Sequence, residues 1–123
     1  MMSQSILLIE DNEQNRYLAT FLLEQSGYQV TQAFDGLTGI ELAREIVPDL
    51  ILLDIQLPGM DGYAVACELR AIESLKTIPI VAVTSYAMVG DREKSLAAGC
   101  NGYIEKPINP DTFVAEIKSF FQY

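Results

Sequence analysis

Hydrophobic runs and amphipathic segments alternate along the whole chain. Residues 5–9, 50–54 and 78–84 are dominated by aliphatic side chains, as is typical of strands buried on both faces of a parallel sheet. Residues 28–33 alternate apolar with polar positions, as a strand near a sheet edge does, and residues 102–106 make a last short strand. The pattern therefore predicts five strands.

Apolar residues recur at helical spacing in the segment that follows each strand. The five predicted helices cover residues 13–26, 37–46, 61–72, 88–98 and 111–121. In the first helix Tyr17 and Phe21 are among the apolar positions, and either Asp11 or Asn12 is suited to cap the start. Asp111 is predicted to cap the last helix.

Strands and helices that alternate with short connections require a parallel sheet with helices on both faces. We therefore predict an α/β fold in a single domain over residues 1–123, because a chain of 123 residues leaves no room for a second core. The common doubly wound order for five such units is 2-1-3-4-5. In that order the first and third strands are neighbours, and ligands bind at the carboxyl ends of the strands.

Polar side chains stand at the carboxyl ends of four predicted strands. They are Glu10 and Asp11 after the first strand, Asp54 on the third, Thr84 on the fourth and Lys106 on the fifth. Carboxylates at adjacent strand ends repel one another, so a cation is expected among them. An all-oxygen ligand set favours a hard ion, and Mg²⁺ with retained water suits so small a set better than Ca²⁺.

A carboxylate such as Asp54 can be the nucleophile that accepts a phosphoryl group, which gives an aspartyl phosphate. A lysine, a hydroxyl and a metal ion are the groups that stabilise charge on phosphoryl oxygens. Each residue also has a structural role open to it: Asp11 as a helix cap, Thr84 as a strand-end hydroxyl and Lys106 as an ion-pair partner of the acids. Their joint position at the strand ends favours the chemical role.

The composition narrows the classes of function. Seventeen acidic residues against eight basic ones give a net charge of −9, which argues against binding nucleic acid or an anionic membrane. The absence of histidine excludes a His/Cys zinc site and a histidine-based triad. Cys67 and Cys100 are expected to be buried thiols. With no signal-peptide pattern and no membrane-spanning apolar run, a cytoplasmic location is expected.

Four motifs occur together at the predicted strand ends. They are Glu10-Asp11-Asn12, Asp54 with Leu57-Pro58-Gly59-Met60-Asp61-Gly62 behind it, Thr84-Ser85, and Lys106-Pro107. In this combination and spacing the chain resembles the receiver domain of bacterial two-component response regulators, over essentially its whole length. The resemblance implies a function in phosphorelay signal transduction. It implies no enzymatic activity beyond the domain's own phosphorylation and dephosphorylation.

The resemblance also implies a role for individual residues. Asp54 would accept phosphate from a phosphohistidine. Asp11, Asp54 and the backbone carbonyl of Gln56 would bind Mg²⁺, with Glu10 helping through water.

Further roles follow from the same resemblance. Lys106 and Thr84 would contact the phosphoryl oxygens, and the bond between Lys106 and Pro107 would be cis. Tyr103 holds the position of an aromatic residue that turns inward when the threonine hydroxyl moves toward the phosphate. Thr84 and Tyr103 would therefore form a switch.

The resemblance implies protein partners. The donor would be a sensor histidine kinase, a hybrid kinase or a phosphotransfer protein. No output domain follows the last helix, so we expect a stand-alone receiver whose signal passes to a downstream protein. The expected surface comprises the fourth helix, the last strand and the last helix around Met88, Arg92, Tyr103 and Phe113. The chain would be a monomer or a phosphorylation-dependent dimer.

Three alternatives fit parts of the pattern. A flavodoxin shares the strand order, but the loop Glu10-Asp11-Asn12-Glu13 would repel the phosphate of a flavin. A phosphatase of the haloacid dehalogenase type also uses a nucleophilic aspartate and Mg²⁺, but it needs a general acid where this chain has Gln56. A degenerate receiver would bind partners without phosphorylation, although the groups that phosphorylation requires are present here.

Overall fold

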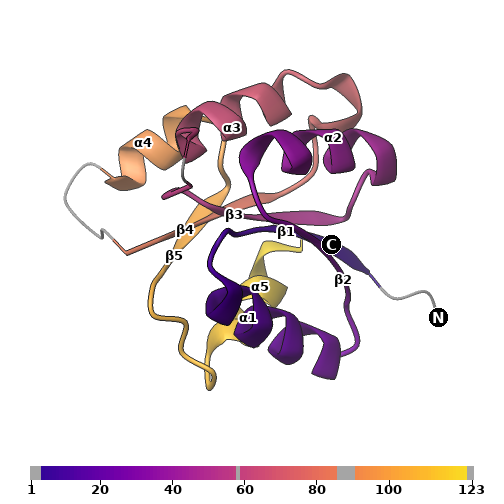
Figure 1. Cartoon of the computed structure of the whole chain (residues 1–123), viewed down its shortest axis with the longest axis vertical. Coiled ribbons are helices and arrows are strands. Elements are labelled where there is room, and N and C mark those ends of the chain that lie inside the picture. The colour runs from indigo at the N-terminus through magenta and orange to yellow at the C-terminus, as the bar shows by residue number, and fades with distance from the viewer. Residues whose placement is uncertain (1–3, 58, 86–90, 122–123) are drawn as a thin grey trace.

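The computed structural model describes residues 4–57, 59–85 and 91–121 (Figure 1). Its strands are β1 (Ser5–Ile9), β2 (Gln29–Ala33), β3 (Leu50–Asp54), β4 (Ile80–Thr84) and β5 (Gly102–Glu105). Its helices are α1 (Glu13–Gln25), α2 (Gly36–Ile46), α3 (Gly62–Arg70), the short 3-10 helix η1 (Glu73–Leu75), α4 (Asp91–Ala97) and α5 (Phe113–Phe120). No helix within these ranges has the length and apolar character that a membrane span needs.

The strands form one parallel sheet in the order β2-β1-β3-β4-β5, which confirms the predicted doubly wound α/β fold. Helices α1 and α5 cover one face, and α2, α3 and α4 cover the other (Figure 1). In register, Ile9 lies opposite Leu53, and Asp54 lies opposite Val83. This register brings the acidic ends of β1 and β3 to the same edge of the sheet.

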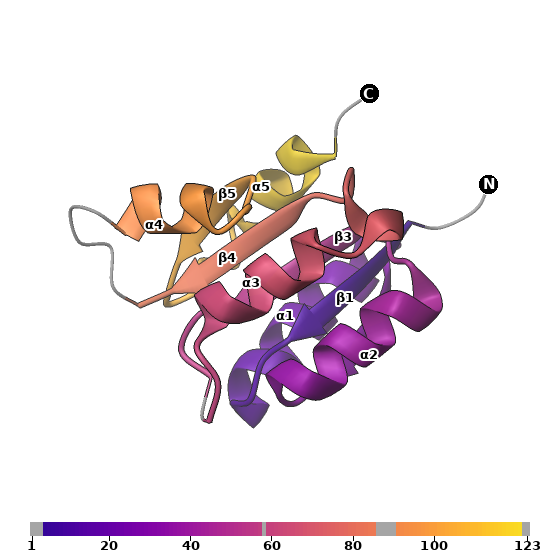
Figure 2. The same cartoon turned by 90° about the horizontal axis from the view of Figure 1, so that it is seen from above.

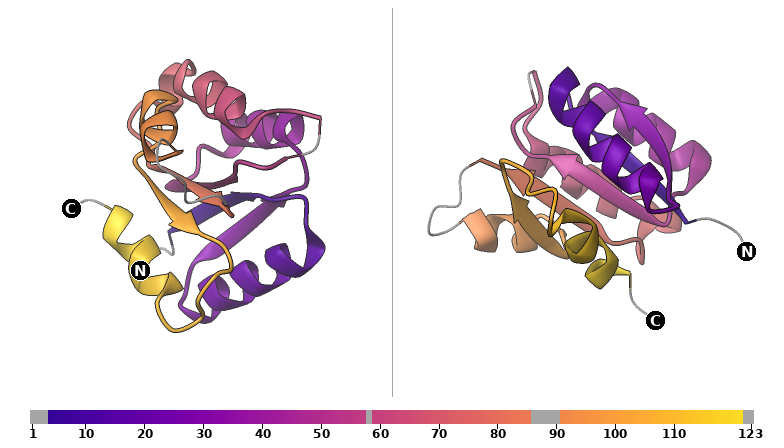
Figure 3. Two further views of the ribbon diagram at one scale, coloured as in Figure 1. Left: turned by 90° about the vertical axis from the view of Figure 1, so that its left-hand side faces the viewer. Right: turned by 90° about the horizontal axis from the view of Figure 1, so that it is seen from below.

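Helices lie on both faces of the sheet (Figures 2 and 3). A hydrophobic cluster on each face holds these layers together. Successive residues of one strand serve opposite clusters, with Leu7 and Ile9 in one and Ile6 and Leu8 in the other. All residues of β3 and β4 are buried. Burial on both faces explains why these strands are continuous aliphatic runs.

Side-chain caps mark where α1, α2 and α3 begin. Asn12 caps α1, because its side chain accepts a hydrogen bond from the N–H of Asn15 at 2.9 Å. The prediction that Asp111 caps the last helix was wrong. Helix α5 begins at Phe113 with Thr112 as the N-cap, and the Asp111 N–H donates to the Asn109 side chain in the preceding turn.

The prediction that both cysteines are buried was wrong, and part of the apolar face of α1 is exposed. Tyr17 and Phe21 lie at apolar positions of α1, yet Ala19 and Leu23 are the residues that α1 buries, while the two rings are exposed. Cys67 lies on the exposed side of α3, so only Cys100 is a buried thiol. Helical spacing identifies an apolar face, but it does not show how much of that face a neighbouring element covers.

Gly62 allows α3 to begin directly against the turn that follows β3. Its N–H donates to the carbonyl of Ile55 at 3.1 Å. A Cβ atom at this position would collide with the Ile55 backbone, which cannot move as a flexible side chain can. Because Ile55 follows Asp54, the glycine also fixes the end of the strand that carries the acid.

We predict that Gly62→Ala lowers the free energy of unfolding by about 1 to 3 kcal/mol, the usual effect of overpacking against a rigid neighbour. Urea unfolding measures the change. The matched control is Glu68→Ala on the exposed side of the same helix, which should remain close to wild type. Equal stabilities of the Gly62→Ala variant and the wild type would contradict the proposed steric role.

Candidate functional site

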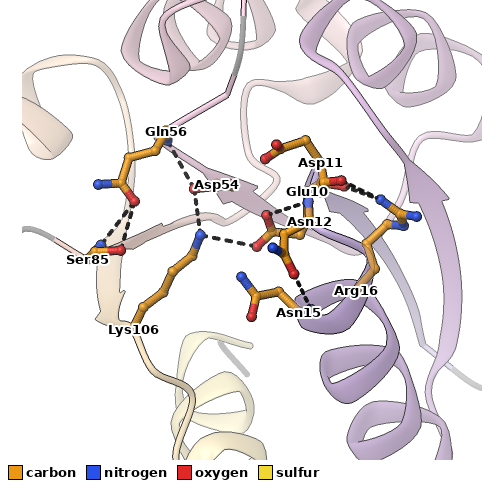
Figure 4. A network of polar contacts seen from close by, with 9 residues as sticks. All are labelled: Glu10, Asp11, Asn12, Asn15, Arg16, Asp54, Gln56, Ser85 and Lys106. Carbon is orange, nitrogen blue, oxygen red and sulfur yellow. Dashed lines mark hydrogen bonds and ion pairs between the residues drawn. The ribbon is translucent and has the colours of Figure 1, made fainter.

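The carboxyl ends of the strands bring together acidic and basic side chains from distant parts of the chain. Glu10 and Asp11 follow β1, Asp54 ends β3, and Lys106 follows β5. Figure 4 shows the Lys106 side chain reaching between Asp54 and Glu10. The structure therefore assembles the group of residues that the sequence predicts.

Lys106 forms an ion pair with each of two buried carboxylates. Its Nζ lies 3.1 Å from Oδ1 of Asp54 and 3.4 Å from Oε1 of Glu10. The side chain of Asp54 is 2% exposed, that of Glu10 4% and that of Lys106 14%. Charges so well buried are tolerated only when they are paired, so each member of this group depends on the others.

Backbone N–H groups orient the two buried carboxylates. The N–H of Gln56 donates to Oδ1 of Asp54 at 3.0 Å, and the N–H of Asn12 donates to Oε2 of Glu10 at 3.2 Å. Both donors belong to the loops that follow the strands. These loops therefore hold the acids in position without using further side chains.

Three carboxylates form a candidate metal site. Glu10, Asp11 and Asp54 each offer an oxygen atom, and these atoms lie within 4.8 Å of one another. Burial and the neighbouring Asp54 raise the pKa of Glu10 to about 7, although Lys106 and the Asn12 N–H oppose the shift. Crowded oxygen ligands of this kind fit a hard cation such as Mg²⁺. The ligand role of the Gln56 carbonyl stays a prediction.

The ends of β3, β4 and β5 are tied together beside this site. Thr84 is buried at the end of β4, and its carbonyl accepts the N–H of Lys106 at 2.8 Å. The side-chain carbonyl of Gln56 accepts hydrogen bonds from the N–H and the hydroxyl of Ser85 at 3.3 and 3.0 Å. The bond between Lys106 and Pro107 is cis, as the resemblance implied.

A family model for the response regulator receiver domain matches residues 6–118. The chain belongs to this family. Its general function is accordingly phosphorelay signalling, in which receiver domains interact with histidine kinases and downstream targets.

Curated and solved proteins agree with this assignment. The receiver domain is 46% identical over 119 residues to the polar-differentiation response regulator DivK of Brucella ovis, covering 97% of each chain. The receiver domain of the sensor histidine kinase PA1611 from Pseudomonas aeruginosa, solved with a magnesium ion in its active site cleft, is 38% identical with a TM-score of 0.89, covering 98% of each chain. The chemotaxis protein CheY4 of Vibrio cholerae is 25% identical with a TM-score of 0.93, covering 97% of this chain and 99% of its own.

The sequence-based reasoning missed Arg16. Its guanidinium donates to the carbonyls of Glu10 and Asp11 at 3.1 and 2.9 Å, so it braces the acidic loop of the receiver domain from α1 (Figure 4). The sequence offered one indication of this role, because Arg16 is the only basic residue of α1 and follows the acidic loop closely. Contacts to backbone carbonyls depend on loop geometry, which residue spacing does not reveal.

The residues predicted to form the output surface differ in their burial. Tyr103 is half-buried and packs against the cluster beneath α2 and α3. Placing Phe113 on this surface was wrong, because it is 0% exposed and belongs to the core cluster on the other face. Met88 and the side chain of Arg92 lie outside the described residues.

We predict that the receiver domain without divalent cations loses stability as the pH rises from 5 to 8. Folding raises the pKa of Glu10 from 4.5 to about 7. Between these pH values the folded state keeps a proton on Glu10 that the unfolded state has lost, so the free energy of unfolding falls as the pH rises. Between pH 5 and 8, the free energy of unfolding of Glu10→Gln should fall by about 1 to 3 kcal/mol less than that of the wild type. Urea unfolding in EDTA measures the effect.

The control for this comparison is Glu13→Gln, which removes an exposed acid at the start of α1 and should keep the wild-type decline. If wild type and Glu10→Gln show parallel pH profiles, the crowding of carboxylates at the site is not energetically significant.

Proposed function

We propose that this receiver domain accepts a phosphoryl group on Asp54 in a Mg²⁺-dependent reaction and passes the signal to a protein partner. The observation that carries the proposal is the buried pair of Asp54 and Glu10 around the ammonium of Lys106, with Asp11 beside them. A buried nucleophilic acid next to a cation and a second metal-binding acid is the arrangement that acyl phosphate formation needs.

Glu10, Asp11 and Asp54 would hold the ion, together with the backbone carbonyl of Gln56. Bound Mg²⁺ would offset the repulsion between the carboxylates and the incoming phosphoryl oxygens. Support comes from the oxygen-only donor set and from the magnesium ion in the active site cleft of the PA1611 receiver domain.

In the proposed step, an oxygen of Asp54 attacks phosphorus and the bond from phosphorus to the donor's histidine nitrogen breaks. The electron pair of that bond returns to the imidazole, which takes up a proton. The ammonium of Lys106, which lies 3.1 Å from Asp54, would bind an oxygen of the transferred group, and the hydroxyl of Thr84 would bind another. The donor would be a histidine kinase or a phosphotransfer protein, and the domain itself would carry the transferred phosphoryl group.

Intact mass measured after incubation with acetyl phosphate and Mg²⁺ tests the proposal. We expect a base-labile adduct of about 80 Da, which should be absent in EDTA and in Asp54→Asn. The matched control is Asp61→Asn, which alters the exposed acid that caps α3 and should still form the adduct. Formation of the same adduct on Asp54→Asn would refute the assignment, and its absence from the wild type would favour a receiver that binds partners without phosphorylation.

We also propose that Thr84 passes the signal to Tyr103. Thr84 ends β4, and β5 pairs with β4 so that Tyr103 lies opposite Ala82 and Glu105 lies opposite Thr84. A shift of the Thr84 hydroxyl toward a phosphoryl group would therefore act directly on the strand that carries Tyr103. The half-buried ring of Tyr103 can change its packing with limited loss of contact.

Amide NMR with beryllofluoride, which stands in for the phosphoryl group, tests this coupling. In wild type and in Thr84→Ser we expect shift changes both next to Asp54 and along β5. In Thr84→Ala the changes next to Asp54 should persist while those at Tyr103 and Ile104 fall at least threefold. Undiminished β5 changes in Thr84→Ala would exclude the threonine as the link.

A further inference from the structure

Exposed apolar side chains gather near the β2 edge of the sheet. In the described part of the chain, the large apolar residues with more than half of their surface exposed are Tyr17 at 73%, Phe21 at 51%, Phe34 at 56% and Leu37 at 67%. The first two lie on α1, and the others lie in the β2–α2 connection and the first turn of α2. Large exposed apolar groups that cluster on one side mark interaction surfaces more often than scattered ones do.

Three of these rings are linked by stacking or through Arg16, and we define Tyr17, Phe21 and Phe34 as the aromatic patch. The rings of Tyr17 and Phe21 stack with centroids 6.5 Å apart and an interplanar angle of 7°. The guanidinium carbon of Arg16 lies 4.0 Å from the centroid of the Phe34 ring. A hollow of about 170 Å³, lined by Glu13, Arg16, Tyr17 and Gln32, lies on the same surface.

Contacts within the chain hold side chains in and around the aromatic patch. Arg16, which stacks on Phe34, is itself held by the carbonyls of Glu10 and Asp11. The side-chain amide of Gln32, which lines the hollow, donates to the hydroxyl of Thr20 at 2.8 Å, and this bond joins β2 to α1. A surface with side chains fixed in this way loses less conformational entropy when it binds than one with free side chains.

We propose that the aromatic patch is a docking site for a protein partner that presents an apolar side chain flanked by lysine or arginine. The apolar side chain would contact the rings of Tyr17 and Phe34. The basic flanks would face Glu13, which lines the hollow, within a chain of net charge −9. Arg16 does not reverse this field, because the net charge of −9 already includes its positive charge.

Charge also argues against a second copy of this chain as the occupant. Two chains of net charge −9 repel each other, whereas a basic partner is attracted. The site is distinct from the surface proposed around Tyr103, because β2 and β5 are the opposite edges of the sheet. The domain would therefore carry a second interaction surface that is independent of Thr84 and Tyr103.

Selection from a displayed library of random twelve-residue peptides on the immobilised full chain tests this proposal. The counter-target is the double variant Tyr17→Ser, Phe34→Ser, and the matched control is Ile46→Ser, Leu96→Ser, which removes exposed apolar residues elsewhere. We expect selected peptides to combine an aromatic or aliphatic residue with lysine or arginine. They should bind the control as they bind wild type and bind the counter-target at least tenfold more weakly.

Peptides that bind the counter-target as well as wild type, or that lack the apolar and basic pattern, would overturn the proposal. Sedimentation equilibrium tests whether a second copy of the chain occupies the patch instead. A dimeric wild type together with a monomeric Tyr17→Ser, Phe34→Ser variant would assign the patch to a second copy and would also overturn the proposal. Unchanged thermal unfolding and unchanged phosphorylation by acetyl phosphate would show that the counter-target is folded. If Tyr17→Ser, Phe34→Ser unfolds, Tyr17→Ser alone replaces it in the same comparison.

Discussion

The ion pairs of Lys106 with Asp54 and Glu10 join the ends of strands that lie far apart in the sequence. One ammonium group stands between two buried carboxylates, and this group remains acidic overall when Asp11 is included. Residual negative charge in a buried place is unfavourable unless a cation compensates for it. This excess of negative charge destabilises the folded site and, for the same reason, favours the binding of a metal ion. The pairing with Lys106 also holds the nucleophilic carboxylate of Asp54 beside a positive charge.

The topology of the sheet creates this arrangement. Because β1 and β3 are parallel neighbours, their acidic ends reach the same edge, and the short loops after them supply N–H groups to the carboxylates. Gly62 keeps the turn after β3 close to the start of α3, and Arg16 braces the loop after β1. The backbone thus fixes the acids before any ligand arrives.

Sequence reasoning succeeded where one physical effect dominates and failed where tertiary context decides. Burial on both faces makes β3 and β4 unmistakable, and the strand order then determines which polar ends meet. The exposure of Tyr17 and Phe21, by contrast, depends on how α1 sits on the sheet, which helical spacing does not determine. Likewise, Arg16 contacts loop carbonyls, which residue spacing does not reveal. Phe113 lies in the core, so its assignment to an output surface was wrong.

The measurement that tests the central claim most directly is ¹⁹F NMR of the domain with beryllofluoride, which occupies the place of a phosphoryl group on Asp54. We predict bound-fluoride resonances that appear with Mg²⁺, disappear in EDTA and are absent in Asp54→Asn. Resonances that do not depend on Mg²⁺, or that persist in Asp54→Asn, would contradict the claim that the carboxylates around Lys106 form a metal-dependent phosphoacceptor site.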